Sequence, residues 1–185
     1  DRGESWRLIE SLWNDESRPR WNGGGSDQPA LHSICVDPRD PACVVVAISS
    51  GGVWRTRDAG ATWTAHTTGM VVTHVPPDQS ELPENQDPHC VVQCPSSPET
   101  FWCQHHMGIW RSTDDLASWE PLHPEPSSFG FPVAVHPGDP DTAWFVPAHS
   151  DQKRAPIDGR VVVTRTRDGG STFEALTNGL PQVHA

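Results

Sequence analysis

The side chains best suited to bind a ligand or a metal ion are imidazoles, one carboxylate and one guanidinium near the ends of predicted β-strands. They are His32, His89, His105, His106, His149, Asp151 and Arg154. Neutral imidazoles at this density can ligate a metal ion. They can also hydrogen-bond an organic ligand, or simply form the hydrated polar rim of a channel. We adopt a ligand-binding interpretation for this set, with no metal and no cofactor.

A repeated motif indicates which elements must position these residues. The segment DRGESW (1–6) returns as DAGATW (58–63), DDLASW (114–119) and DGGSTF (168–173). The copies start 57, 56 and 54 residues apart (1 to 58, 58 to 114, 114 to 168). Self-similarity at a fixed period is typical of repeat architectures, in which each repeat is one supersecondary unit.

Each copy has the chemistry of a tight turn between two strands. An Asp carboxylate can accept hydrogen bonds from backbone N–H groups further along the turn, and Gly adopts positive φ without a steric penalty. A Ser or Thr two residues before the Asp can bond across the hairpin, and the aromatic residue anchors the next strand. The turn residues are Asp1, Gly3, Trp6, Thr56, Asp58, Gly60, Trp63, Ser112, Asp114, Trp119, Thr166, Asp168, Gly170 and Phe173.

The rest of each unit predicts four short strands. The segments VDPRDP (36–41), QCPSSP (93–98) and VHPGDP (135–140) are Pro-rich turns, each followed by a run of mainly apolar or β-favouring residues. We therefore expect an all-β protein, a β-propeller of four-stranded antiparallel blades at about 29–68, 86–123 and 129–178. The segment 5–13 is expected as the orphan outer strand of a further blade, so that 1–185 form one partial propeller.

The pattern S/T-x-D-x-G-x-S/T-W resembles the Asp-box, or BNR, repeat of sialidases, sortilin-like receptors, some endoglucanases and a photosystem assembly factor. The third copy departs from it with Leu116 in place of Gly, and the fourth with Phe173 in place of Trp. The resemblance implies that the turns lie on the face away from the ligand site. It also implies a fragment of a larger propeller, its ring completed by missing chain segments or by a second subunit.

The resemblance makes a glycoside hydrolase an alternative function. Sialidases of this fold use a Tyr nucleophile and an arginine triad, but the sequence has no Tyr. Arg55, Arg111 and Arg165 recur directly before the turns, which places them in the scaffold. A two-carboxylate glycosidase would draw on Asp27, Asp78, Glu84, Asp87, Glu125, Asp151 and Asp158, and nothing in the sequence pairs any two of them.

A binding or scaffold module is the interpretation we prefer. The irregular segments CQHHMGIW (103–110), VPPDQSELPENQDPH (75–89) and DQKRAPIDGR (151–160) would form its top face. Stiff, Pro-rich loops lose little entropy on binding, which suits recognition. We expect a peptide, protein or glycan as the ligand at this face.

The composition narrows the choice of partners. The formal net charge is −11, which disfavours binding to nucleic acids and to anionic membranes. No apolar run approaches the roughly 20 residues of a membrane span. Five Cys without a C-x-x-C motif are expected as reduced, buried thiols, which favours a cytoplasmic location.

Overall fold

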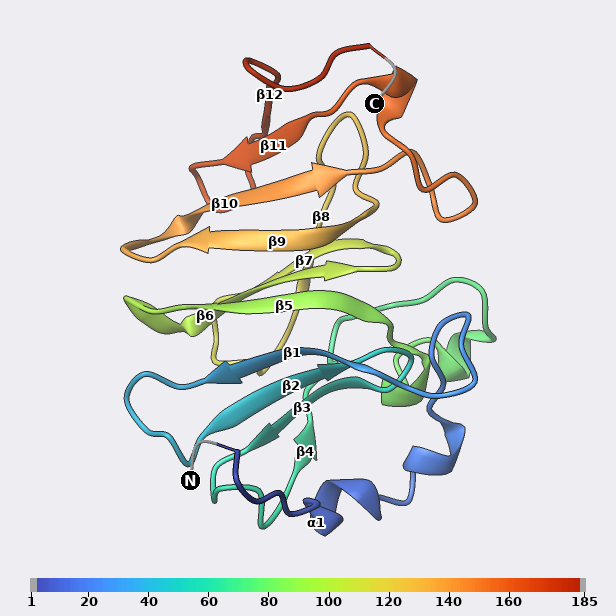
Figure 1. Ribbon diagram of the computed structural model, residues 1–185, viewed down its shortest axis with the longest axis vertical. Helices are drawn as coiled ribbons and strands as arrows, with labels where there is room; N and C mark the ends of the chain where they lie inside the picture. The colour runs from blue at the N-terminus through green and yellow to red at the C-terminus, as the bar shows by residue number, and fades with distance from the viewer. Residues whose placement is uncertain (1–2, 184–185) are drawn as a thin grey trace.

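Three four-stranded antiparallel sheets are stacked along the long axis of the molecule (Figure 1). This computed structural model describes residues 3–183, so Asp1 lies outside the described residues. We call the sheets blades 1, 2 and 3; in each of them the strands follow one another in chain order. The fold class is therefore all-β, as the repeat predicts.

The first strand of each blade contacts the first strand of the neighbouring blade. Blade 1 contains β1 (Leu31–Val36), β2 (Val44–Ile48), β3 (Gly52–Thr56) and β4 (Thr64–Ala65). Blade 2 contains β5 (Pro88–Cys94), β6 (Ser97–His105), β7 (Gly108–Ser112) and β8 (Glu120–Leu122). Blade 3 contains β9 (Gly130–His136), β10 (Asp139–Pro147), β11 (Val163–Thr166) and β12 (Glu174–Leu176). The first strands β1, β5 and β9 contact one another in that order.

The helical segments are short and lie in the connections. Within residues 3–183 they are α1 (Glu10–Trp13) and four 3₁₀ turns at Arg18–Arg20, Pro77–Gln79, Pro83–Asn85 and Ile157–Gly159. No helix among the described residues is long and apolar enough to span a membrane.

The hydrophobic core lies between the blades. Val45, Ala47 and Val53 of blade 1 pack against Val91 and Phe101 of blade 2, and all five are at most 3% exposed. A second cluster joins blades 2 and 3. Blade 2 is covered on both faces, by blades 1 and 3, so its strand β6 is buried at successive positions from Thr100 to His105 and lacks the simple alternation of a sheet with one wet face.

The cysteines belong to this packing. All five, at positions 35, 43, 90, 94 and 103, are free thiols in the structure. Burial raises the pKa of Cys35 to about 11 and raises that of Cys103 well above its usual range. The thiols of Cys35 and Cys103 therefore act as small apolar groups near neutral pH.

The three described Asp turns share one hydrogen-bond pattern. In blade 1, Thr56 Oγ1 donates to Asp58 Oδ1 at 2.7 Å, and the same carboxylate accepts the backbone N–H and the hydroxyl of Thr62, at 2.8 and 2.7 Å. The bonds from Thr62 lower the pKa of Asp58 to about 2. Ser112–Asp114–Ser118 and Thr166–Asp168–Thr172 repeat the pattern.

Leu116 occupies the glycine position of the blade 2 turn. Its φ is +67°, which is strained for a side chain with a branched γ-carbon. The leucine side chain is only 1% exposed and packs in the core between blades 1 and 2. Burial of this apolar side chain offsets the backbone strain.

Two of the three arginines directly before the Asp turns connect one blade to the next. Arg55 donates to the carboxylate and the backbone oxygen of Asp115 in the blade 2 turn, at 2.8 and 2.7 Å. Arg111 likewise reaches the carbonyl of Gly169 and the carboxylate of Asp141 in blade 3. Arg165 pairs with Glu174 of its own blade. All three arginines are therefore engaged within the scaffold.

The expectation of an outer strand at 5–13 is wrong. Residues 5–9 form no regular element, and α1 follows at Glu10–Trp13. Residues 5–13 pair with no described strand, and the segment packs through Leu12 and Ile9 beside blade 1. Trp6 is 91% exposed and does not anchor a strand.

Candidate functional site

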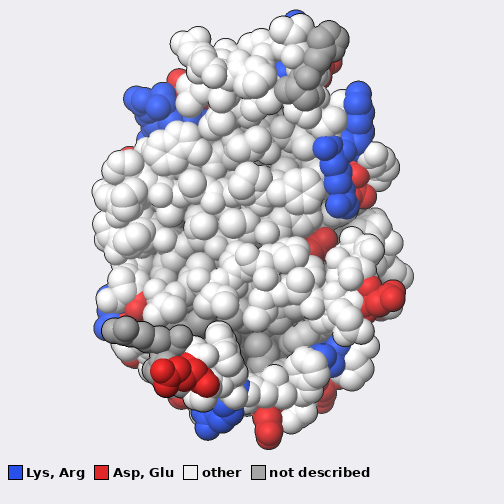
Figure 2. Space-filling view, in the orientation of Figure 1, with Lys and Arg blue, Asp and Glu red and all other residues white. Residues whose placement is uncertain are grey.

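A cavity of about 550 Å³ lies where the first strands of the three blades begin. Its lining residues are Gly23, Gly24, Leu31, His32, Asp87, His89, Phe131 and Arg154. Figure 2 shows a largely uncharged central surface in this view, with the acidic and basic side chains around its margin. The residues that line the cavity thus include an aromatic ring, two imidazoles, one carboxylate and one guanidinium.

The repeat explains why three of these side chains meet. His32, His89 and Phe131 each stand six residues before the first Pro of a Pro-rich turn, at Pro38, Pro95 and Pro137. They therefore occupy equivalent places near the start of β1, β5 and β9. Since neighbouring first strands contact one another, one repeat position supplies one side chain from each blade to the same cavity.

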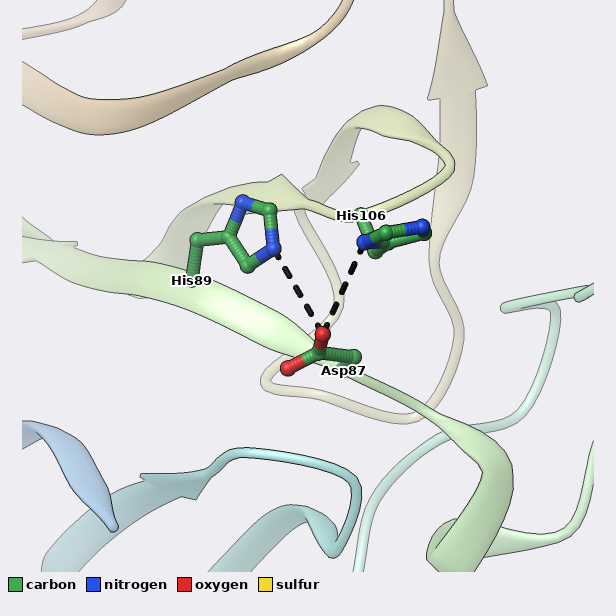
Figure 3. Close-up of side chains that lie close together, drawn as sticks. All are labelled: Asp87, His89 and His106. Carbon is green, nitrogen blue, oxygen red and sulfur yellow. Dashed lines mark ion pairs between the residues drawn. The ribbon is translucent and has the colours of Figure 1, made fainter. Parts of the chain in front are cut away.

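Asp87 lies at the centre of a small polar cluster. Its Oδ2 is 3.5 Å from His89 Nε2 and 3.6 Å from His106 Nδ1. Both rings point towards this oxygen, His89 from β5 and His106 from the turn after β6 (Figure 3). The three side chains are 15%, 6% and 28% exposed, in the order Asp87, His89 and His106.

Electrostatics keep Asp87 ionised in this cluster. Burial raises the pKa of its carboxyl, but the imidazole of His89 and the other nearby imidazoles outweigh burial, so the pKa lies below its usual value. Oδ1 accepts the backbone N–H of Ser50 at 3.4 Å. The loop at Gly24 also approaches closely: a Cβ at that position would lie 2.9 Å from Oδ2. Asp87 is thus a carboxylate held from several sides.

The prediction that His105 contacts a ligand is wrong, because its side chain is fully buried. Burial lowers its pKa to about 3, so the ring is neutral. The backbone N–H groups of Asp87 and Met107 point at its two ring nitrogens, at 2.9 and 3.0 Å. A neutral imidazole accepts one of them at a time. His105 supports the backbone that carries Asp87.

The other predicted residues come from the insertion between β10 and β11. Arg154 lies 5.4 Å from the centre of the Phe131 ring, on the cavity side, and pairs with Asp151. The hydrogen bond from Arg154 lowers the pKa of Asp151. His149 is exposed, and it is not among the residues that line the cavity.

Sequence reasoning missed two aromatic residues and undervalued Asp87. Phe131 stacks on the His89 ring, with centroids 4.8 Å apart and planes 18° apart, and Phe129 meets the same ring edge-on at 5.7 Å. The offset of six residues from Pro137 could have identified Phe131. Asp87 stands two residues before His89, a spacing that could have indicated their contact at the start of β5.

Comparison with known proteins gives a fold and no family. No protein-family model matches the sequence, and no curated protein matches it. Among solved structures, the chain is similar to an ancestral GH74 enzyme, with a TM-score of 0.59 and 16% identity over 83% of this chain and 18% of that one. It is also similar to YCF48 from Cyanidioschyzon merolae, with a TM-score of 0.54 and 22% identity over 78% of this chain and 39% of that one.

A further neighbour is YCF48 bound to D1 peptide, with a TM-score of 0.50 and 18% identity over 79% of this chain and 39% of that one. The chain thus spans between 18% and 39% of the length of these three proteins. At these identities the likeness concerns the fold alone: the chain has a β-propeller fold with three four-stranded blades. Membership of the Asp-box family remains a prediction, because no family model matches.

Proposed function

We propose that this chain is part of a non-catalytic propeller that binds a peptide segment of a partner protein at the cavity around His89 and Phe131. The observation that supports this most is the convergence of equivalent side chains from β1, β5 and β9 on one recess. Arg154 adds a cation at its edge. Aromatic and arginine side chains are the residue types that most often dominate the energy of protein recognition.

The nature of the walls favours a peptide. A stacked aromatic–imidazole pair can hold an apolar side chain, while Arg154 can bind a carboxylate or a backbone carbonyl. The Pro-rich connection 75–89 contains Asp87, and its prolines limit the motion of the part of the cavity wall that Asp87 forms. The neighbouring structure of YCF48 bound to D1 peptide gives a precedent within this fold.

A hydrolase of the two-carboxylate kind has less support. Such enzymes need two carboxyl groups flanking the scissile bond. Asp87 is the one carboxylate among the described residues that line the cavity. Asp151 nearby is engaged with Arg154. The likeness to GH74 enzymes adds no residue-level argument at 16% identity.

Peptides selected on the purified chain from a phage-displayed random library should lose about tenfold in affinity in Phe131→Ala and in Arg154→Ala, because each change removes a wall of the cavity. Tenfold corresponds to about 1.4 kcal/mol. Fluorescence polarisation with a labelled selected peptide measures the change. Arg160→Ala is the control, since Arg160 is exposed in the same insertion but does not line the cavity. An absence of enriched peptides, or affinities equal in all three variants, would overturn the proposal.

We also propose that a further blade covers the free face of blade 1. Ile34 and Val91 occupy equivalent places, 57 residues apart (34 to 91). Val91 is 2% exposed because blade 1 covers it, whereas Ile34 is 64% exposed. Beside Ile34 lies an apolar groove of about 770 Å³ that also includes Val44 and Trp63. This is the surface that an inter-blade contact normally buries.

Light scattering should therefore detect species larger than the 20.3 kDa chain as concentration rises. The Ile34→Asp variant should have the mass of a single chain at the same concentrations, because the substitution puts a charge in the apolar surface through which the chains associate. Val183→Asp, an exposed apolar position outside the groove, is the control. A chain that stays monomeric and binds no hydrophobic dye at this face would contradict an uncovered inter-blade surface.

A further inference from the structure

The cluster of Asp87, His89 and His106 has the composition of a transition-metal site. Each residue offers one ligand atom, and the three atoms lie within 4.8 Å of one another. Among the described residues, no other group of three His, Cys, Asp or Glu side chains lies close enough together to share an ion. One carboxylate and two imidazoles suit zinc and its neighbours, while Ca²⁺ and Mg²⁺ prefer oxygen ligands alone.

The hydrogen bonding of His89 determines which nitrogen can bind an ion. Its Nδ1 lies 2.7 Å from the carbonyl oxygen of Gly130, which can only accept, so Nδ1 must carry a proton. In a neutral ring Nε2 then holds a free lone pair, and this atom faces Asp87. Metal-binding histidines usually donate their second nitrogen in this way, which fixes the tautomer and the ring orientation.

Nε2 of His89 and the Asp87 carboxylate face each other across a short gap. The two atoms are 3.5 Å apart, and both are electron-rich when the imidazole is neutral. His106 presents a second nitrogen to the same oxygen at 3.6 Å. A metal ion placed among these atoms would contact all three groups at once.

The surroundings hold the ligands close to a binding geometry. Phe131 and Phe129 fix the plane of the His89 ring by stacking and edge contact. The backbone N–H of His106 donates to the backbone oxygen of Asp87 at 2.9 Å, which ties the two ligand segments together. Tetrahedral zinc with bonds of about 2.0–2.1 Å places its ligands about 3.3 Å apart. The two short separations are near that value, and the His106 turn can supply the remaining movement.

We propose that Asp87, His89 and His106 bind one divalent transition-metal ion, of which Zn²⁺ is the probe to use, with an open coordination position towards the cavity. This inference goes beyond the proposed peptide binding and does not depend on it. A three-ligand site with one open position can accept water or a donor atom from a ligand. Metal binding with no peptide binding, or the reverse, would separate the two proposals.

Isothermal titration of the chelator-treated chain with ZnCl₂ should show one ion per chain. His89→Ala and His106→Ala should weaken binding at least about 100-fold, because loss of an outer-shell partner alone costs about 10–100-fold. His123→Ala, an exposed imidazole outside the cluster, should bind like the parent. If His89→Ala fails to fold, His106→Ala decides, since its side chain lies on a turn and is 28% exposed.

Co²⁺ distinguishes this site from the five free thiols. The expected visible spectrum of the cobalt-loaded chain is that of nitrogen and oxygen ligands, without the near-ultraviolet charge-transfer band of a cobalt thiolate. That band, absence of one-site binding, or affinities unchanged in both histidine variants would each overturn the proposal.

Discussion

Replacing Trp119 by alanine is expected to lower the free energy of unfolding by about 3–5 kcal/mol, the usual cost of deleting a buried Trp side chain. The ring is 2% exposed and packs with Met70 and Leu116 in the core between blades 1 and 2. Its Nε1 donates to the backbone oxygen of His66 at 2.9 Å, so the change also removes a bond between blades. Urea unfolding followed by far-ultraviolet circular dichroism measures the loss.

The repeat supplies a matched control for this prediction. Trp6 stands at the same motif position but is 91% exposed, and Trp6→Ala should change stability by no more than about 0.5 kcal/mol. Trp119→Phe keeps a ring in the core and stays measurable if the alanine variant does not fold. Equal losses at positions 6 and 119 would show that the motif aromatic contributes locally and does not join blades.

The fold could be predicted from the sequence because repeated turns carry their own chemistry. Asp58, Asp114 and Asp168 each close a hairpin by hydrogen bonds to nearby Ser and Thr residues. Because the residue types of the motif determine these local bonds, the order of the strands can be predicted from the sequence. The segment 5–13 was mispredicted for the same reason. A turn motif implies a following strand, but a strand is stable only when it pairs with others in a sheet, and residues 5–13 pair with none of the described strands.

The site was less accessible to such reasoning because it arises between repeats. The equivalence of His32 and His89 was visible, and extending it to Phe131 needed only the third Pro-rich turn. What the sequence could not show is the direction of each side chain. His105 and His106 are adjacent, yet one ring is fully buried and the other faces Asp87. That difference follows from the alternation of side chains at the end of β6.

Arg55→Met should destabilise the chain by about 3 kcal/mol or more, because each of its two charged hydrogen bonds contributes about 1.5–3 kcal/mol and the partner is left partly desolvated. Arg55 is 6% exposed and makes two bonds to Asp115 across the boundary between blades 1 and 2. Methionine retains the apolar stem, so the loss reports mainly the guanidinium. The same urea titration measures it, with the slope of the transition checked for constancy.

Arg165→Met tests whether the loss of stability comes from removing an arginine at this repeat position or from removing the bond that Arg55 makes between blades. Arg165 occupies the same repeat position, but it pairs with Glu174 of its own blade, and that carboxylate is 50% exposed. An exposed ion pair contributes about 0–1 kcal/mol, so this variant should lose at most that amount. A large difference between the two variants would mean that the arginine stabilises the propeller by joining successive blades. Similar losses would instead assign the contribution of the arginine to the hairpin in which it lies.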